Sequence, residues 1–82
     1  MYYVYMVECA DKTLYTGITT DIARRVEEHN HSPKGARYTR SRRPVSLVYS
    51  EIFADRSSAS KREYEIKKMN KRSKCKLIKN MV

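Results

Sequence analysis

The residues in this chain that could do chemistry are tyrosines, an arginine, a histidine and a glutamate. Tyr5 and Tyr15 stand in two early apolar stretches, Arg25 and His29 follow one helical turn apart, and Glu63 comes much later. A guanidinium suits a phosphate, and a carboxylate can hold a divalent metal. A phenol or an imidazole can orient a water or move its proton, although a free phenol titrates near pH ~10 and needs a cationic neighbour or metal to act as a base. Together these groups suit hydrolysis of a phosphodiester bond.

Each of these residues also has a structural explanation. The tyrosines could be amphipathic core aromatics, and the histidine could be a satisfied residue on a helix face. Gly17 could serve only to permit a backbone conformation near a strand end. Surface ion pairs could account for the charged groups, namely Arg25 with Asp21 and Glu63 with Lys67.

Three apolar stretches predict the strands of one sheet. Residues 2–7 form an unbroken apolar and aromatic run, and residues 14–19 resume it after a polar turn, which predicts a hairpin. Residues 45–53 predict a third strand. Because the first stretch is apolar on both faces, we place it in the middle. The expected fold is α+β, with a three-stranded antiparallel sheet of order 2-1-3 flanked by helices.

A helix after the hairpin is expected to present the arginine and the histidine together. Residues 22–30 have helical spacing, with Ile22, Val26 and His29 on one face and Arg25 beside them. This spacing places the guanidinium and the imidazole on neighbouring turns of one helix.

A second, charged helix is predicted from the capping residues at 55–58 to about Arg72. Its apolar stripe consists of Ala59, Ile66 and Met69. Glu63 lies on the same stripe, and a carboxylate turned toward an apolar face must find a cation, a metal or a set of donors. Ser73 is expected to cap a last short helix that carries Leu77, Ile78 and Met81.

The chain carries a formal charge of +9, which favours polyanions such as nucleic acid through counterion release. Residues 31–44 have no clear period and are expected to form a basic loop with at most a short helical turn. Its acid-free stretch supplies the candidate substrate-binding cations Lys34, Arg37, Arg40, Arg42 and Arg43. A second basic run spans residues 67–79. The alternatives are a solvated basic face, or attraction to an acidic protein or to lipid, of which lipid is disfavoured because no wide apolar face backs the second run.

Length and composition narrow the class of protein. A chain of 82 residues closes one core, so we expect a single domain over residues 1–82. Neither a membrane-spanning stretch nor a secretory leader is visible, which predicts a cytoplasmic protein without membrane contact. Cys9 and Cys75 form no Cys-x-x-Cys pair, which favours free, buried thiols over a zinc or redox site. Because no zinc finger or helix-turn-helix is visible, we expect recognition of nucleic-acid shape and backbone.

Four stretches in order resemble the GIY-YIG nuclease superfamily, and within it the small stand-alone bacterial proteins, which are similar to the catalytic domain of the eukaryotic structure-selective endonuclease. These are residues 15–19 (YTGIT), 24–30 (RRVEEHN), 34–39 (KGARYT) and 61–65 (KREYE). The resemblance covers residues 3–70. The chain departs from the pattern at Tyr3, where the first motif has glycine, and at Thr16, where the second has isoleucine.

The resemblance implies a role for each residue of the candidate site. The two motif tyrosines are Tyr5 and Tyr15, the motif glycine is Gly17, the catalytic arginine is Arg25, and Glu63 is the metal-binding glutamate. We add Gly17 to the candidate substrate-binding residues, and His29 to the catalytic ones because it could relay a proton or hold a phosphate oxygen.

The expected function is therefore that of a metal-dependent endonuclease that uses one divalent ion, Mg²⁺ or Mn²⁺. Branched or flapped DNA in repair or recombination is the expected substrate, with DNA favoured over RNA. Larger members append a DNA-binding domain, so a protein partner could supply targeting here. The alternatives are a non-catalytic DNA- or RNA-binding module of the same fold and a basic adaptor for an acidic protein.

Overall fold

A three-stranded antiparallel sheet lies at the centre of the computed structural model, which describes residues 1–80. The central strand β1 (Tyr2–Glu8) pairs with β2 (Leu14–Thr19) on one side and β3 (Ser46–Phe53) on the other. The order β2-β1-β3 confirms the predicted topology. In the register, Tyr5 stands opposite Gly17 of β2, so the two residues share one face of the sheet.

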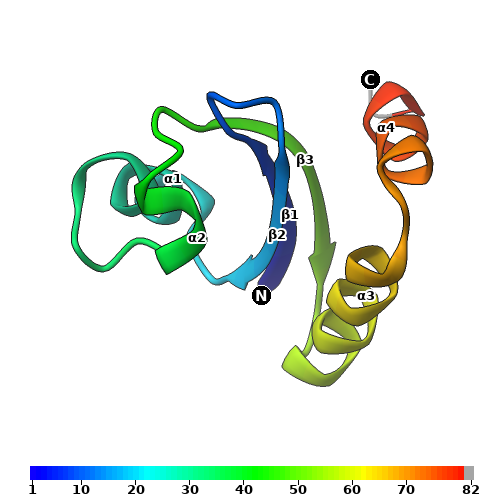
Figure 1. Cartoon of the computed structure of the whole chain (residues 1–82). Helices are drawn as coiled ribbons and strands as arrows, with labels where there is room; N and C mark the ends of the chain where they lie inside the picture. The colour runs from blue at the N-terminus through cyan, green and yellow to red at the C-terminus, as the bar shows by residue number, and fades with distance from the viewer. Residues whose placement is uncertain (81–82) are drawn as a thin grey trace.

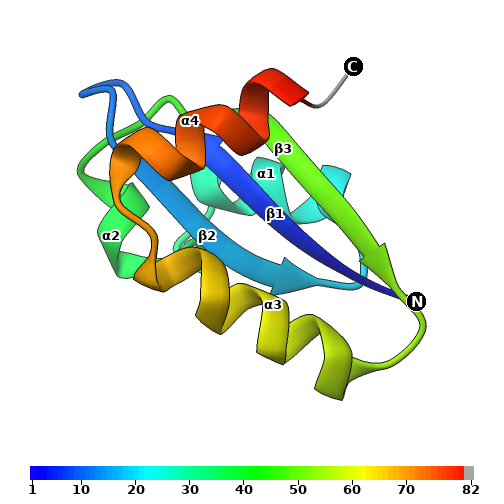
Figure 2. The same ribbon diagram turned by 90° about the vertical axis from the view of Figure 1, so that its right-hand side faces the viewer.

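Helices cover both faces of this sheet. Figure 1 shows α1 and α2 on one side and α3 and α4 on the other, and Figure 2 shows α3 and α4 in front of the strands. Their bounds are α1 (Ile22–His31), α2 (Arg37–Arg40), α3 (Arg56–Lys68) and α4 (Lys71–Asn80). Among the described residues, no helix is long and apolar enough to cross a membrane.

Strand β1 is buried on both faces, as its sequence predicted. Val4 and Met6 point toward α3 and join a cluster that includes Ala59 and Ile66. Tyr5 and Val7 point the other way and form a second cluster with Cys9 and Val45. The two clusters hold α1 and α3 on opposite faces of the sheet.

The boundaries of the last two helices correct the sequence prediction. The long helix ends at Lys68 rather than near Arg72, because Met69 turns into extended backbone and packs against the core cluster. Asn70, not Ser73, caps the final helix: its side-chain oxygen accepts a hydrogen bond from the Ser73 backbone N–H at 2.8 Å. Met81, which was expected on this helix, lies outside the described residues.

The thiols agree in part with their prediction. Cys9 and Cys75 are both free, and Cys9 is buried while Cys75 is half-buried.

Candidate active site

Tyr5 of β1 lies directly across from Gly17 of β2. A Cβ atom built on Gly17 would stand 2.6 Å from Tyr5 Oη, so any other residue there would force the buried Tyr5 ring to move. Gly17 does not have a positive φ, so its role here is the space it leaves rather than backbone freedom. The Tyr5 ring and its hydroxyl fill the space that the missing side chain of Gly17 leaves.

The hydroxyl of Tyr5 meets the imidazole of His29 on α1. Tyr5 Oη and His29 Nε2 are 2.7 Å apart, and on the other side of the ring Nδ1 lies 2.8 Å from Thr39 Oγ1. The Thr39 hydroxyl donates its single proton to the Ala36 carbonyl oxygen at 2.9 Å, so it accepts from Nδ1–H. The Ala36 N–H also approaches this nitrogen, at 3.4 Å, which is a longer and weaker contact than that of Thr39, so we assign the proton to Nδ1. This network leaves Nε2 unprotonated, so Tyr5 donates its proton to His29.

Burial acts on both members of this pair. Tyr5 is 1% exposed and His29 is fully buried. Desolvation raises the pKa of Tyr5 to about 12, although the nearby Arg25 guanidinium opposes the rise. Desolvation, followed by the charge of Arg25, lowers the pKa of His29 to about 4. At neutral pH the phenol therefore keeps its proton and the imidazole is uncharged.

The second tyrosine packs edge-on against the same imidazole. Tyr15 and His29 have ring centroids 5.3 Å apart at an interplanar angle of 67°. On its other side Tyr15 stacks against Tyr38 of α2, at 6.0 Å and 22°, and the Arg42 guanidinium covers Tyr38 at 4.0 Å. Tyr38 and Thr39 lie in the KGARYT stretch, but their roles could not be predicted from the sequence, because their contacts depend on how the loop folds back on α1.

Gly35 is the point at which that loop closes onto α1. A Cβ atom there would lie 2.6 Å from the Glu28 carbonyl oxygen and 2.9 Å from His29 Cα. The guanidinium of Arg43 fastens the far end of the loop, because it donates to the carbonyl oxygens of His29 and Ser32 at the end of α1. The loop therefore holds Thr39 against the imidazole.

Arg25 lies in a hollow of about 310 Å³ between α1 and the start of α3. Its guanidinium donates to Glu28 Oε1 at 3.0 Å and to the Lys34 carbonyl oxygen at 2.9 Å. The alternative ion pair with Asp21 is not present, because the Asp21 carboxylate caps α1 by accepting from the Arg24 N–H. The charged residues that line the hollow are three arginines and one carboxylate, namely Arg24, Arg25, Arg56 and Glu28.

Glu63 is half-buried on α3. Burial is the main cause of the raised pKa of Tyr5, and the charge of Glu63 adds only a small further rise. Its carboxylate forms an ion pair with Lys67 at 3.2 Å. Lys67 is the partner expected if Glu63 has only a structural role. The described residues contain no group of three or more His, Cys, Asp or Glu side chains that could enclose a metal. One carboxylate nevertheless fits Mg²⁺ or Mn²⁺, because Mg²⁺ keeps several waters and is often held by one or two carboxylates and substrate phosphates.

The structure divides the five candidate phosphate-binding cations into two groups. Arg42 donates to Asp11 Oδ2 at 3.0 Å and to the Tyr38 carbonyl oxygen at 2.8 Å, and Arg43 caps α1. Lys34, Arg37 and Arg40 are exposed and take part in no ion pair among residues 1–80. The first group holds the loop together, and the second is available to a ligand.

Comparison with known proteins identifies similar chains. The family model of the GIY-YIG catalytic domain matches residues 1–76. A UPF0213 protein of Desulfotalea psychrophila is 67% identical over 78 residues, which are 95% of this chain and 71% of that protein. A second, of Staphylococcus haemolyticus, is 52% identical over 94% of this chain and 93% of its own length. The solution structure of the UPF0213 protein from Bacillus halodurans matches with a TM-score of 0.64 and 44% identity, over 99% of this chain and 86% of that one.

Proposed function

Because this chain belongs to the GIY-YIG catalytic domain family, we propose that it is a metal-dependent endonuclease that hydrolyses phosphodiester bonds in branched or flapped DNA. The observation that carries the proposal is the buried Tyr5–His29 hydrogen bond close to Arg25, whose side chain lines the hollow. DNA rather than RNA, a role in repair or recombination, a cytoplasmic location and a targeting protein partner are the finer parts of the proposal, and they rest on the family resemblance.

Arg25 would bind the scissile phosphate. At rest its guanidinium is held by Glu28, which is half-buried with it, so an incoming phosphate competes with one carboxylate for a bidentate donor. The other two arginines of the hollow favour the phosphate in this competition. As charge builds on the phosphate oxygens during attack, the same fork would stabilise it more strongly than in the ground state.

Tyr5 and His29 would move the proton of the attacking water. The Tyr5 oxygen takes a proton from the water while its own proton passes to His29 Nε2, so neither group carries a separate charge before attack. Phosphate bound at Arg25 would offset the positive charge that lowers the pKa of His29, which makes the imidazole a better acceptor when substrate is present. Tyr15 would hold the imidazole in place through its edge-on contact.

Glu63 would hold the divalent ion, with waters and a substrate phosphate as the remaining ligands. When bound, the ion supplies Lewis-acid stabilisation of the developing charge and of the leaving oxygen. In the structure the same carboxylate is paired with Lys67, so metal binding at Glu63 would compete with that ion pair.

Cleavage of branched and plasmid DNA with Mg²⁺ or Mn²⁺, against EDTA, tests this function. Glu63→Gln keeps the side-chain shape and removes the charge, so the variant should bind branched DNA and fail to cut it. Glu27→Gln is the control, because Glu27 lies on α1 outside the lining of the hollow, is 73% exposed and pairs only with His31 among residues 1–80. It should cut like the wild type.

Two results would contradict the proposal in different ways. Cleavage at the normal rate by Glu63→Gln would exclude the metal role of that carboxylate. A wild-type protein that binds DNA and never cuts it under any of these conditions would make the chain a non-catalytic binding module of the same fold.

A further inference from the structure

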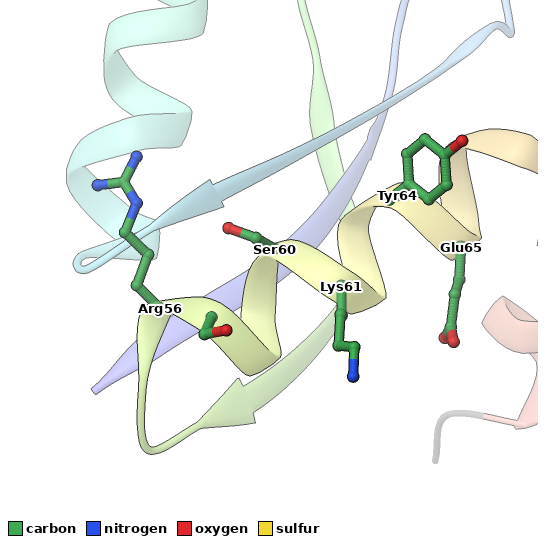
Figure 3. A pocket seen from close by; sticks show the side chains of 6 residues that line it. Arg56, Ser60, Lys61, Tyr64 and Glu65 are labelled. Atoms are coloured by element: carbon green, nitrogen blue, oxygen red, sulfur yellow. The ribbon is translucent and has the colours of Figure 1, made fainter.

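An open groove runs along the solvent side of α3, outside the hollow that contains Arg25. It lies between two rows of side chains, and successive residues within each row are about one helical turn apart. Figure 3 shows one row with Arg56, Ser60 and Tyr64 and the other with Lys61 and Glu65. Residues four apart on a helix form such parallel ridges, and the space between them is a groove.

Tyr64 is the aromatic side chain most exposed in this groove. It is 63% exposed, which leaves the ring free of the core, and Lys68 Nζ lies 4.7 Å from its ring centroid. A largely exposed tyrosine contributes less to the fold than a buried one, and an exposed aromatic ring close to cations suits stacking of an unpaired base.

The charge of the groove favours a polyanion. Arg56 and Lys61 take part in no ion pair among residues 1–80, while the Glu65 carboxylate is neutralised by Arg62 at 3.2 Å. The groove therefore offers two unpaired cations beside the ring.

Arg56 connects the groove to the candidate active site. It lines both the groove and the hollow of Arg25. Figure 3 shows its side chain leaving α3 in the direction of α1. From Arg56 to Tyr64 the helix rises about 12 Å, at about 1.5 Å per residue. That length accommodates on the order of three stacked nucleotides at about 3.4 Å each.

We propose that this groove binds the unpaired strand of a nucleic acid that enters the active site. One base stacks on Tyr64, and the neighbouring phosphates contact Lys61 and Arg56. The inference rests on the proposed function, because the strand held at Arg56 is the one that continues to Arg25. It would give the protein a preference for substrates with a single-stranded flap over continuous duplex.

Binding of a labelled single-stranded oligonucleotide in EDTA, where no cleavage occurs, tests the groove separately from the nuclease activity. Tyr64→Ala should weaken single-strand binding about fivefold or more, while Tyr64→Phe retains it, since stacking needs the ring and not the hydroxyl. The fluorescence of a 2-aminopurine base in the strand should change on binding to the wild type and not to Tyr64→Ala. Ile52→Ala is the control, because Ile52 is 56% exposed on β3, outside the groove. It should bind like the wild type.

Duplex DNA of the same length and polyglutamate are the comparison ligands. Unchanged single-strand binding by Tyr64→Ala would overturn the proposal, and so would an equal loss for single strand and duplex. A Tyr64-dependent interaction with polyglutamate but not with the oligonucleotide would assign the groove to an acidic protein instead. If the wild type never cuts DNA but Tyr64 controls single-strand binding in EDTA, the groove stands while the nuclease function fails.

Discussion

Tyr5 and His29 are held uncharged over the whole physiological range. The phenol keeps its proton up to a pH of about 12, and the imidazole takes none until the pH falls to about 4. The cause of both shifts is burial first and, for His29, the charge of Arg25 second. This uncharged pair is the resting state, and a phosphate bound at Arg25, as proposed, would favour protonation of His29 by placing negative charge nearby.

The low pKa of His29 predicts how stability depends on pH. Between pH 6.5 and pH 4 the unfolded chain binds a proton at this residue and the folded chain does not, so the free energy of unfolding should fall as the pH falls through that window. The full stabilisation is present above pH 6.5, and about 3 kcal/mol of it should be lost by pH 4, since one unit of pKa is worth about 1.4 kcal/mol. Urea unfolding at several pH values measures this loss.

Carboxylates also titrate near the lower end of this range, so the comparison is with His29→Gln. That variant should be less stable at neutral pH but should show a flatter pH dependence between pH 6.5 and pH 4. Parallel curves for the wild type and the variant would show that the imidazole is not kept neutral by its surroundings.

At the scale of the elements, the sheet was predictable because its signals are local. The apolar run at residues 2–7 is buried on both faces, and that burial required two neighbours and fixed the order of the strands. The break between α3 and α4 was not predictable, because residues 67–76 carry almost no apolar period and the turn depends on Met69 reaching the core. The short helical turn that was allowed within residues 31–44 is α2, but its position could not be predicted, because its N-cap, Ala36, has no side-chain hydrogen bond.

Some contacts of the candidate site were likewise predictable from the sequence, and others were not. The proximity of Tyr5, Gly17 and His29 was predictable in outline, because it depends on the pairing of two strands and on helical spacing, and both are visible in the sequence. The contacts of Arg42 with Asp11 and of Arg43 with the end of α1 could not be predicted, because these groups become neighbours only after the loop has folded. A basic stretch in a sequence does not distinguish a cation that binds a ligand from one that binds the protein's own carbonyl oxygens.

One element carries a polar group that its surroundings do not satisfy. Thr16 of β2 is 3% exposed, and its hydroxyl has no hydrogen-bond partner among residues 1–80. This is the position at which the resemblance has isoleucine, and the register places it beside Met6 on the face toward α3. A buried hydroxyl without a partner costs free energy.

Thr16→Val should therefore stabilise the fold. It removes the hydroxyl and keeps the β-branched shape that suits a strand, so the free energy of unfolding should rise by about 1 kcal/mol or somewhat more. Thermal or urea unfolding measures the change, with Thr19→Val as the control, because the Thr19 hydroxyl accepts from the Asp21 N–H and its loss should destabilise. A less stable Thr16→Val protein would mean that the hydroxyl finds a partner in solution.

At the scale of the whole molecule, the sheet separates the positive charge into two groups. The exposed cations of the loop lie on the side of α1 and α2, and the basic face of α4 lies on the other side, as Figure 1 shows for the helices themselves. Only the first group is joined to the Tyr5–His29 pair through the short α1–α2 loop. We therefore expect contact with the duplex part of a substrate to run through the loop rather than through α4.

The salt dependence of duplex binding tests that asymmetry. Replacing Lys34, Arg37 and Arg40 together with Ala should weaken binding similarly for unrelated sequences, because these side chains would contact phosphate and read no base. The slope of log K against log salt concentration should flatten by about 0.9 for each phosphate contact that is lost.

The matched control removes the same number of charges from α4, as Arg72→Ala, Lys76→Ala and Lys79→Ala, all of them exposed. That variant should lose affinity only through the weaker general attraction of a less basic protein, and its slope should stay close to that of the wild type. Equal flattening in the two triple variants would mean that the duplex contacts both sides of the sheet, and an unchanged slope in the loop variant would remove Lys34, Arg37 and Arg40 from the interface.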